Sequence, residues 1–418
     1  MFNYDIEKLF SHNPKSIINF RKESLKDLDS LKLPNMGKLK ISDFMTEELN
    51  LENVILTKQS FVPVELEKLV SLDNENVIII KDGNIVYENL TGNYQDIYIN
   101  DFNSAFEERP EVILDFFQRE LSELRHNKMT ALNGGYMNSG ILIDIPKNIE
   151  LKEEIKLYYV QENVDFIHRT IVNVGANSSV KFVEYFSNLG DCYVNIVSDL
   201  YLGEGAKVKY FSVDNYTDKT TGYSALRSIL GTKSELLTTR GILSNGNIIV
   251  DTLVDLVGEF SSTDIKTIAI ADRGQKQNIN TATFHNAKLS SSNIVNQGVS
   301  KDKAKLYFNN FGKIERGMSE SKAFQSTRGI ILDRYAQIQA NPFLLIDEYD
   351  VKAGHGATIG KFDDDSMFYL MSRGLTKSDA EKLIINGFIN PILDGIDNET
   401  LKEELRSIID RKLGDWFE

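Results

Sequence analysis

The chain has 418 residues, of which 41% are hydrophobic and 26% are charged, and this balance is typical of a folded globular protein. Its formal net charge of −14 argues against a nucleic-acid backbone as a partner. No segment approaches the ~20 apolar residues that a membrane span needs, and the N-terminal MFNYDIEKLFSHNPKS lacks the pattern of a signal peptide. With Cys192 as the single cysteine, no internal disulfide can form, and we expect a cytoplasmic protein.

Residues 1–135 are predicted to form a mostly helical region that contains one β-hairpin. In KSIINFRKESLKDLDSL, apolar residues recur at helical spacing, and Pro34 follows soon enough to stop the helix. NVIIIKDGNIVYEN joins two apolar runs at Asp82 and Gly83, which is a strong hairpin signal. PEVILDFFQRELSEL returns to helical spacing, with Pro110 at a first-turn position.

Residues 136–360 consist of short β-rich runs separated by clusters of Gly, Asn, Ser and Asp. A weak internal repeat aligns GANSSVKFVEYF with GEGAKVKYFSV and places Val180 and Val208 28 residues apart. Turns and strands at such a period are typical of stacked coils. We therefore predict a mainly β fold, a right-handed parallel β-helix flanked by a mixed and helical N-terminal segment and a helical C-terminal segment. A β-sandwich is the alternative, although over this length it should show more hairpin turns.

Residues 361–418 are predicted to be helical again. In DDDSMFYLMSRGL, Gly374 fits a helix C-terminal cap. In TKSDAEKLIINGF, Ser378 and Glu381 have the spacing of a capping box. ETLKEELRSIIDRKL has the pattern of a last amphipathic helix.

This helical segment carries more apolar surface than a short helical cap needs. We expect some of it to cover the last coil of the β-helix and some to bind a partner, because aromatic residues and methionine are enriched at the centres of interfaces. The candidate partner-binding residues are Met367, Phe368, Leu370, Met371 and Phe388.

The sequence lacks the motifs of common catalytic and cofactor sites. H-E-x-x-H and G-x-S-x-G do not occur, and a single cysteine excludes C-x-x-C. GATIGKF resembles a phosphate loop, but it has three residues between its glycines and Phe362 after Lys361. The acidic run FDDD could be interpreted as a calcium site, but we favour the simpler interpretation that Asp365 or its neighbours cap the following helix. We therefore expect a non-enzymatic scaffold that needs partners.

The histidines are scattered, and none has a second histidine at ligand spacing. His168 lies in a strand-like run and is interpreted as structural, and Cys192 as a small buried hydrophobe. His355 stands between Gly354 and Gly356, which predicts a bare turn that a ligand or another backbone could approach closely. The five histidines are His12, His126, His168, His285 and His355.

Three stretches resemble the SufB/SufD family of iron–sulfur cluster assembly proteins. MTALNGGYMNSGILIDIPKNIEL resembles the start of the family's β-helix, and GIILDRYAQIQANPFLLIDEYDVKAGHGATIG resembles its C-terminal coils. DDDSMFYLMSRGLTKSDAEKLIINGF resembles its terminal helical segment. GHGATIG is closer to the D branch of the family, although Ala353 and Gly354 replace the Cys-Ser that often precedes the histidine there.

The resemblance implies a SufBCD complex in which the chain pairs with a SufB-like paralogue through the β-helix and with the ATPase SufC through the C-terminal helices. It also implies that His355 holds a transient iron–sulfur cluster opposite a cysteine of the paralogue, and neutral imidazole is a good iron ligand. Reduced flavin is an implied cofactor of the complex, although no flavin motif is visible. We expect the isolated chain to hold neither group, and its homodimerisation stays open. A carbohydrate-active β-helix enzyme and a polymerising structural β-helix are the alternatives.

Overall fold

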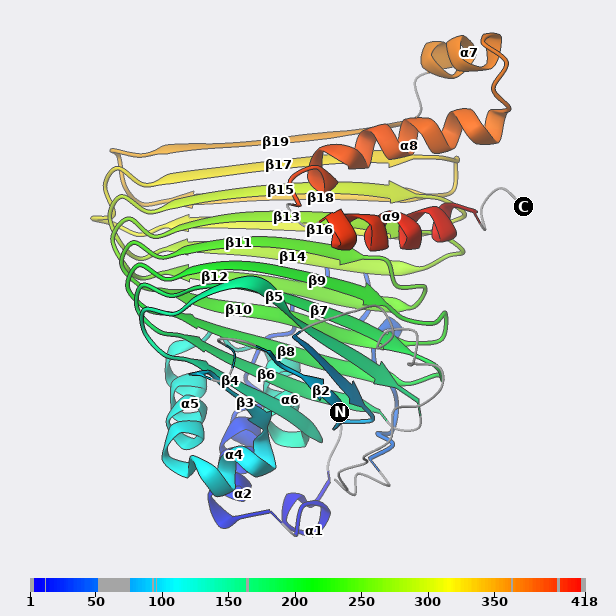
Figure 1. Ribbon diagram of the computed structural model, residues 1–418. Helices are drawn as coiled ribbons and strands as arrows, with labels where there is room; N and C mark the ends of the chain where they lie inside the picture. Colours follow the sequence, from blue (N-terminus) through cyan, green and yellow to red (C-terminus); the bar gives the residue numbers. More distant parts are fainter. Residues whose placement is uncertain are drawn as a thin grey trace.

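The structure is a computed structural model, and the residues that it describes are 4–11, 13–51, 76–91, 94, 96–162, 165–361, 364–396 and 399–414. Its centre is a tall stack of strands, with one group of helices at the end where the chain begins and a second group beside the opposite end (Figure 1). Among the described residues, no helix is both long and apolar enough to cross a lipid bilayer.

Two parallel sheets form the stack, and the chain passes from one sheet to the other after each strand. This alternation makes a β-helix of about eight turns in the described part of the chain. Sheet A contains β5 (Glu150–Gln161), β7 (Ser179–Asn188), β9 (Lys207–Asn215), β11 (Glu235–Ile242), β13 (Ser262–Ala271), β15 (Ser291–Ser300), β17 (Lys322–Ile331) and β19 (Lys352–Lys361). Sheet B contains β4 (Ser139–Ile145), β6 (Phe166–Val174), β8 (Tyr193–Leu202), β10 (Thr221–Leu230), β12 (Asn247–Leu256), β14 (Lys276–His285), β16 (Lys305–Ile314) and β18 (Gln337–Ile346).

The internal repeat corresponds to one turn of this β-helix. Val180 of β7 lies beside Val208 of β9 in parallel register, as the alignment of the two segments requires. Because side chains alternate between the two faces of a strand, Val208 joins the core between the sheets while Phe211 joins a cluster outside sheet A. The prediction of a mainly β fold built on a parallel β-helix, with helical segments at both ends, is confirmed, and the β-sandwich alternative is wrong.

The predicted β-hairpin is present and forms the first two strands of sheet A. β1 (Val77–Lys81) and β2 (Asn84–Asn89) pair around Asp82 and Gly83, whose φ angles are +46° and +82°. Positive φ at both central residues defines the hairpin turn whose twist matches the flanking strands. β1 also pairs in parallel with β5, and β3 (Tyr98–Asp101) pairs with β4, so strands of the N-terminal region extend both sheets.

The N-terminal helices pack on the outer face of sheet B, where Phe116 contacts Tyr201. Pro110 opens its helix in the first turn, as predicted. The first predicted helix ends at Lys26, well before Pro34, because the chain turns at Asp27, whose carbonyl accepts a hydrogen bond from the hydroxyl of Ser30. The elements are α1 (Ile6–Leu9), α2 (Lys15–Lys26), a 3₁₀ turn (Ile41–Asp43), α4 (Phe102–Glu108), α5 (Pro110–Glu123) and α6 (Lys128–Tyr136).

The C-terminal helices lie beside the β-helix rather than over its end. Ile389 and Leu405 pack against outward-facing residues of sheet A such as Phe211 and Ile268. The last strands, β18 and β19, stay mostly exposed, so the expectation that this segment covers the last coil is wrong. The elements are α7 (Asp364–Ser372), α8 (Lys377–Leu393) and α9 (Glu399–Gly414).

One of the two predicted helix caps in this segment is correct. Gly374 has a φ of +95°, and its N–H donates to the carbonyl of Met371, as expected for a C-terminal cap. The predicted capping box at Ser378 and Glu381 is wrong, because α8 begins two residues earlier. Its cap is Thr376, whose hydroxyl accepts from the backbone N–H of Asp379 at 3.1 Å.

Candidate functional site

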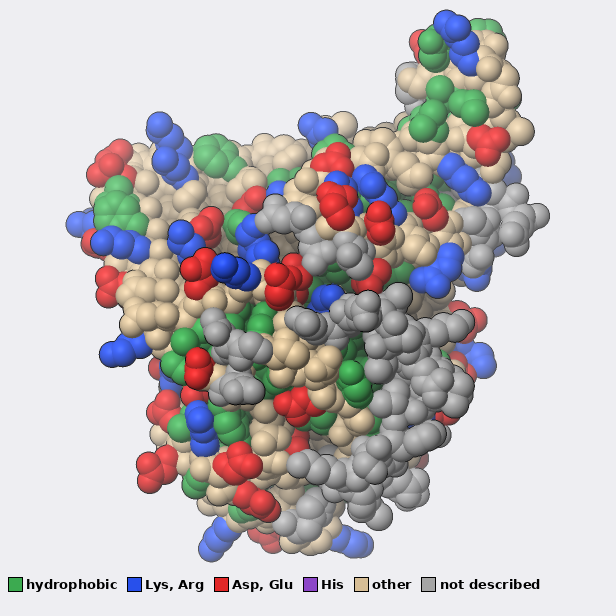
Figure 2. Space-filling view, viewed as in Figure 1, with side chains coloured by type: hydrophobic (Ala, Val, Ile, Leu, Met, Phe, Trp, Pro, Cys, Tyr) green, Lys and Arg blue, Asp and Glu red, His purple; other side chains and the backbone are tan. Residues whose placement is uncertain are grey.

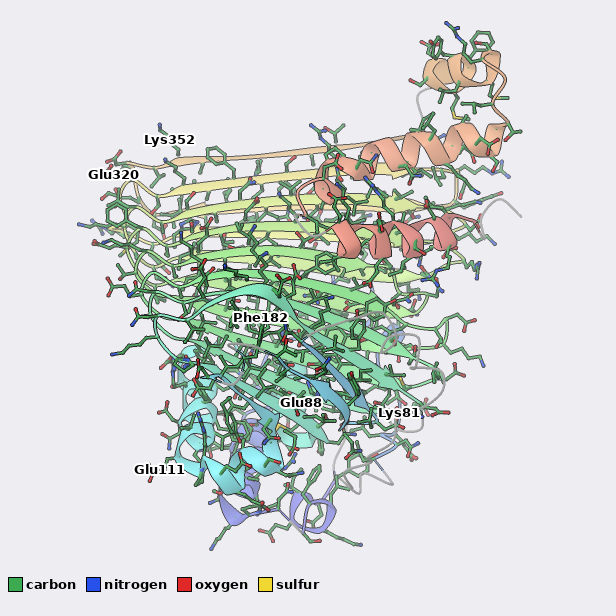
Figure 3. All side chains as sticks on the ribbon, in the orientation of Figure 1. Lys81, Glu88, Glu111, Phe182, Glu320 and Lys352 are labelled. Carbon is green, nitrogen blue, oxygen red and sulfur yellow. The ribbon has the colours of Figure 1, made fainter. Side chains whose placement is uncertain are left out.

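The β-helix has an open end at its last turn. Along β19 only one edge is hydrogen-bonded to a neighbouring strand, β17, in the described part of the chain. Figure 3 shows Lys352, the first residue of β19, on the rim of this end. A strand edge presents unpaired N–H and C=O groups, which readily pair with another chain.

Apolar side chains surround this open end. Phe343 on β18 is 54% exposed and stacks on Phe311 of β16, with ring centroids 5.6 Å apart. Clustered exposed apolar residues mark interaction sites on soluble proteins. The large exposed hydrophobic residues of the last two turns are Phe324, Tyr335, Phe343, Leu345, Ile346, Tyr349 and Ile359.

His355 lies on this edge, and the structure places it in a strand. It pairs with Gln325 in the regular register between β19 and β17, so the prediction of a turn is wrong. Gln325 is only 4% exposed and occupies a register column that continues inward through Ile294 of the core. His355 therefore ends an interior column at the mouth of the β-helix, where it is exposed.

The two flanking glycines leave the backbone around His355 accessible. Because neighbours alternate between faces, Gly354 and Gly356 lie on the opposite face of β19 from His355. A Cβ atom at Gly356 would meet no atom of the described residues within 4 Å, apart from its two chain neighbours. Packing inside this chain therefore does not require glycine at position 356. The missing side chain would instead give a partner strand room to approach the backbone of β19.

A polar layer crosses the interior of the β-helix. The carboxylate of Glu184 accepts hydrogen bonds from Tyr159 at 3.0 Å, Thr170 at 2.9 Å, Ser198 at 2.8 Å and the hydroxyl of Tyr210. The five side chains are buried and come from both sheets. Four donors satisfy the carboxylate and offset the large cost of removing it from water.

Asp214 and Arg240 continue this layer one turn further on. Arg240 donates to Ser212 at 3.1 Å and Ser224 at 2.6 Å, and its guanidinium lies 3.8 Å from the Asp214 carboxylate. Burial raises the pKa of Asp214 to about 6, with Arg240 opposing this shift and the nearby Glu184 adding to it. Asp214 therefore changes charge close to neutral pH.

The polar layer extends to the open end. Asn296 donates to Asn310 at 2.8 Å, and Asn310 donates to Thr327 at 3.0 Å. Thr327 of β17 is in register with Ala357 of β19, two residues after His355. The sequence analysis missed this layer, and its only signal was the polar residues at alternating positions of otherwise apolar strands.

The predicted partner-binding residues divide into two groups. On α7, Phe368 is 75% exposed and Met371 46% exposed, while Met367 and Leu370 are half-buried. Phe388 on α8 instead packs against the cluster between the C-terminal helices and sheet A. Figure 2 shows α7 projecting from the rest of the molecule with hydrophobic side chains on its surface.

The other histidines have structural surroundings where the structure describes them. His168 is fully buried, and its ring nitrogens lie 2.8 Å from the hydroxyl of Ser139 and 3.1 Å from that of Thr170. Burial lowers the pKa of His168 to about 3 and that of His285 to about 4. The structural interpretation of His168 is therefore confirmed, and His12 lies outside the described residues.

Cys192 is buried, with 8% of its surface exposed, and burial raises the pKa of its thiol to about 12. It is therefore a poor nucleophile, and its interpretation as a small buried hydrophobe is confirmed. Within the described ranges, no group of three or more His, Cys, Asp and Glu side chains is arranged to hold a metal ion.

A buried ion network, which the sequence analysis also missed, joins α5 to sheet B. Glu120 lies 2.9 Å from Arg169 and 3.0 Å from Arg227, and Arg227 pairs with Asp199 at 2.8 Å. Burial alone would raise the pKa of Glu120, but the two arginines outweigh it and lower that pKa to about 2. His126 lies 3.6 Å from the same carboxylate. The network fixes the N-terminal helices on the β-helix.

Comparisons with known proteins place this architecture in a family. The description "SUF system FeS cluster assembly, SufBD core domain" matches residues 158–388, and "SufBD protein N-terminal region" matches residues 1–157. The chain is 31% identical over 413 residues to the iron–sulfur cluster assembly protein SufD of Bacillus subtilis, with 96% of this chain and 94% of the relative covered.

Two staphylococcal relatives align over a similar length. The iron–sulfur cluster assembly SufBD family protein of Staphylococcus saprophyticus is 25% identical over 421 residues, covering 94% of this chain and 89% of the relative. Its counterpart in Staphylococcus haemolyticus is 24% identical over 433 residues, covering 97% and 90%. The two family descriptions and the individual relatives all cover both the N-terminal region and the β-helix. The chain therefore belongs to the SufBD family of iron–sulfur cluster assembly proteins.

Proposed function

We propose that the chain is a non-enzymatic scaffold subunit of an iron–sulfur cluster assembly complex in the cytoplasm. In this proposal it pairs with a SufB-like paralogue through the open end of the β-helix, and it binds the ATPase SufC through α7. The observation that carries the proposal is the position of His355 at the mouth of the β-helix, on a strand edge free to receive another chain.

The nascent cluster is the cargo of such a scaffold. His355 is exposed on the edge strand, so its imidazole can reach a metal ion held partly by a second chain. Neutral imidazole and thiolate are both good iron ligands, and a site divided between two chains forms only when they meet. The thiol of Cys192 is buried and does not serve this role, so the thiolate comes from the paralogue.

The α7 helix supports the ATPase assignment. Phe368 and Met371 are exposed, and no residue of α7 belongs to the cluster that holds α8 and α9 on sheet A. A protruding helix with aromatic and methionine side chains suits a groove on a partner. Phe388 supports this role indirectly, because it belongs to the apolar contact that holds α8 on sheet A. Reduced flavin in the complex stays a prediction.

The test is reconstitution of the chain with a SufB-like paralogue and SufC. We expect Phe343→Asp to weaken binding of the paralogue only, and Phe368→Asp to weaken binding of SufC only. Leu189→Asp is the matched control, since Leu189 is 52% exposed on the surface of the β-helix and should affect neither. Full assembly of both test variants, judged by gel filtration, would overturn the two interface assignments.

A further inference from the structure

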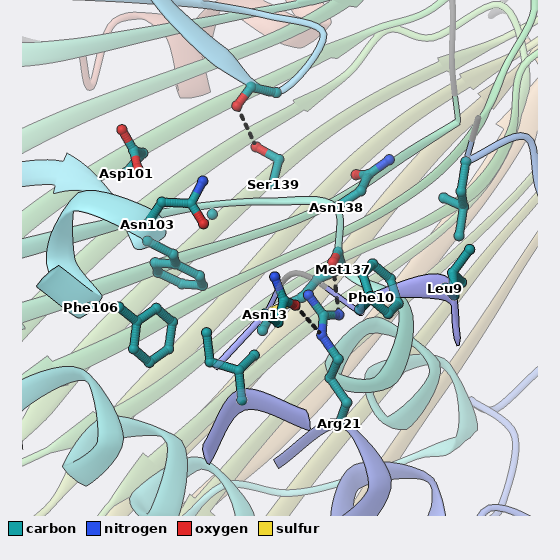
Figure 4. Close-up of a pocket in the computed structure, with 15 residues that line it drawn as sticks. Leu9, Phe10, Asn13, Arg21, Asp101, Asn103, Phe106, Met137, Asn138 and Ser139 are labelled. Carbon is teal, nitrogen blue, oxygen red and sulfur yellow. Dashed lines mark hydrogen bonds between the residues drawn. The ribbon is translucent and has the colours of Figure 1, made fainter. Parts of the chain in front are cut away.

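A cavity with a volume of about 100 Å³ lies far from the open end of the β-helix, between the N-terminal helices and the first strands. Figure 4 shows Arg21 reaching into it from α2, beside Phe10 and Asn13. Phe106 of α4 lines another part of its wall. Neither the SufB-facing edge nor α7 contributes to it.

Among the described residues, Arg21 is a buried cation without an anionic partner. The residue is 5% exposed, and it forms no ion pair with any described side chain. Its Nε donates to Asn13 at 3.1 Å, and its Nη1 donates to the carbonyls of Gly135 and Met137 at 3.2 and 2.8 Å. The guanidinium carbon lies 3.7 Å from the ring centre of Phe10. These contacts orient the group, but none of them neutralises its charge.

The guanidinium keeps donors for a ligand. Within the described part of the chain, Nη2 of Arg21 makes no hydrogen bond, and neither does the amide nitrogen of Asn13. Arginine presents its N–H groups as a planar fork, which matches a carboxylate. Burial lowers the pKa of Arg21 to about 9, so the side chain is charged at neutral pH. A buried charge of this kind is costly unless an anion joins it.

The remaining wall limits the ligand. Phe10, Ile17, Phe102 and Phe106 give the cavity apolar surface for a short tail. Asp101 also lines it, well separated from Arg21 in Figure 4, and its negative charge disfavours a dianion such as phosphate. The volume of about 100 Å³ restricts the site to a small ligand.

We propose that this cavity binds a small monocarboxylate with a branched or short apolar tail, whose carboxylate pairs with Arg21. The tail contacts the phenyl rings of the wall, and the amide of Asn13 donates to the second carboxylate oxygen. The site is independent of the proposed function, because it lies in the N-terminal region and uses none of the residues assigned to cluster assembly.

Titration of the full-length protein with isovalerate, at constant ionic strength and pH 7, tests the proposal by calorimetry and ligand-observed NMR. We expect saturable binding of isovalerate and at least tenfold weaker binding of isovaleramide, which has the same shape without the charge. Arg21→Gln should abolish binding. Because this change also removes three structural hydrogen bonds, a second variant leaves Arg21 in place.

Asn103→Trp on α4 fills the cavity from its exposed wall, and it should weaken isovalerate binding at least tenfold. Glu107→Trp is the matched control, since it adds the same side chain one turn further along α4 and outside the cavity. Phe106→Ala should shift the preference toward a bulkier carboxylate. No saturable binding of isovalerate, equal binding of isovaleramide, or equal binding by the two tryptophan variants would overturn the assignment.

Discussion

Asp214→Asn should change how the stability of the protein depends on pH. The pKa of Asp214 is raised from 3.8 to about 6 because the carboxylate is buried between the sheets. Between pH 3.8 and about 6, Asp214 is therefore mostly protonated in the folded state and mostly ionised in the unfolded state. The stabilising contribution is complete below pH 3.8, and it is lost as the pH rises through about 6.

The size of this loss follows from the shift. One pKa unit corresponds to about 1.4 kcal/mol, so the shift of roughly two units costs about 3 kcal/mol at high pH. Part of the loss has already occurred at pH 4.5, which leaves about 2 kcal/mol between pH 4.5 and 7.5. Asparagine does not titrate, so the variant should gain about this much relative to the wild type over that interval.

The assay is urea unfolding followed by far-ultraviolet circular dichroism at the two pH values. The attraction of Arg240 for the ionised carboxylate is already included in the shifted pKa, and any constant difference between asparagine and the protonated carboxyl cancels when only the change with pH is compared. Asp218→Asn is the matched control, since Asp218 is exposed in the turn that follows β9. If Asp214→Asn and the wild type lose the same stability between pH 4.5 and 7.5, the burial argument is refuted.

The other predictions concern the ion network, the C-terminal helices and the cluster. Glu120→Gln should lower the free energy of unfolding by about 3–5 kcal/mol, because it leaves buried arginines short of a partner, and a loss below about 1 kcal/mol in urea would contradict the network. Leu405→Ala should cost about 2–5 kcal/mol through a cavity under α9, whereas Leu383→Ala, on the exposed surface of α8, should cost little in the same assay. His355→Ala should change the free energy of unfolding by no more than about 0.5 kcal/mol but lower the iron and sulfide content of the reconstituted complex. His355→Cys should retain more cluster than His355→Ala or His355→Lys. A normal iron and sulfide content in the alanine variant would contradict the assignment of His355. The isolated chain, supplied with iron and sulfide without oxygen, should stay colourless, and a brown stoichiometric cluster would contradict the two-chain site.

Features that depend on neighbouring residues in the chain could be predicted from the sequence. The hairpin at Asp82 and Gly83 follows from local turn chemistry, and the alignment of Val180 with Val208 follows from a repeat whose strands stack in register. Glycine at the end of α7 is equally local. In each case the residues that determine the structure are close together or repeated at a fixed spacing.

The position of His355 and the polar layer could not be predicted in this way. GHGATIG has turn-forming residues, yet pairing with a strand 30 residues away keeps it extended, and that pairing is a tertiary contact. Glu184 reads as an outward-facing charge in SVKFVEYF until its tyrosine, serine and threonine partners from other turns are known. Alternation of side chains indicates two faces, but it does not say which face is buried when both carry apolar residues.

The open end of the β-helix also has a consequence for the cell's supply of this protein. A turn with a neighbour on only one side is the least stable part of a stacked array, and its exposed edge is an aggregation hazard. Subunits made in excess of their partners are therefore the ones most readily degraded or lost to insoluble material. In the proposed complex, the amount of this protein in the cell should therefore follow the amount of the partner that covers its open end.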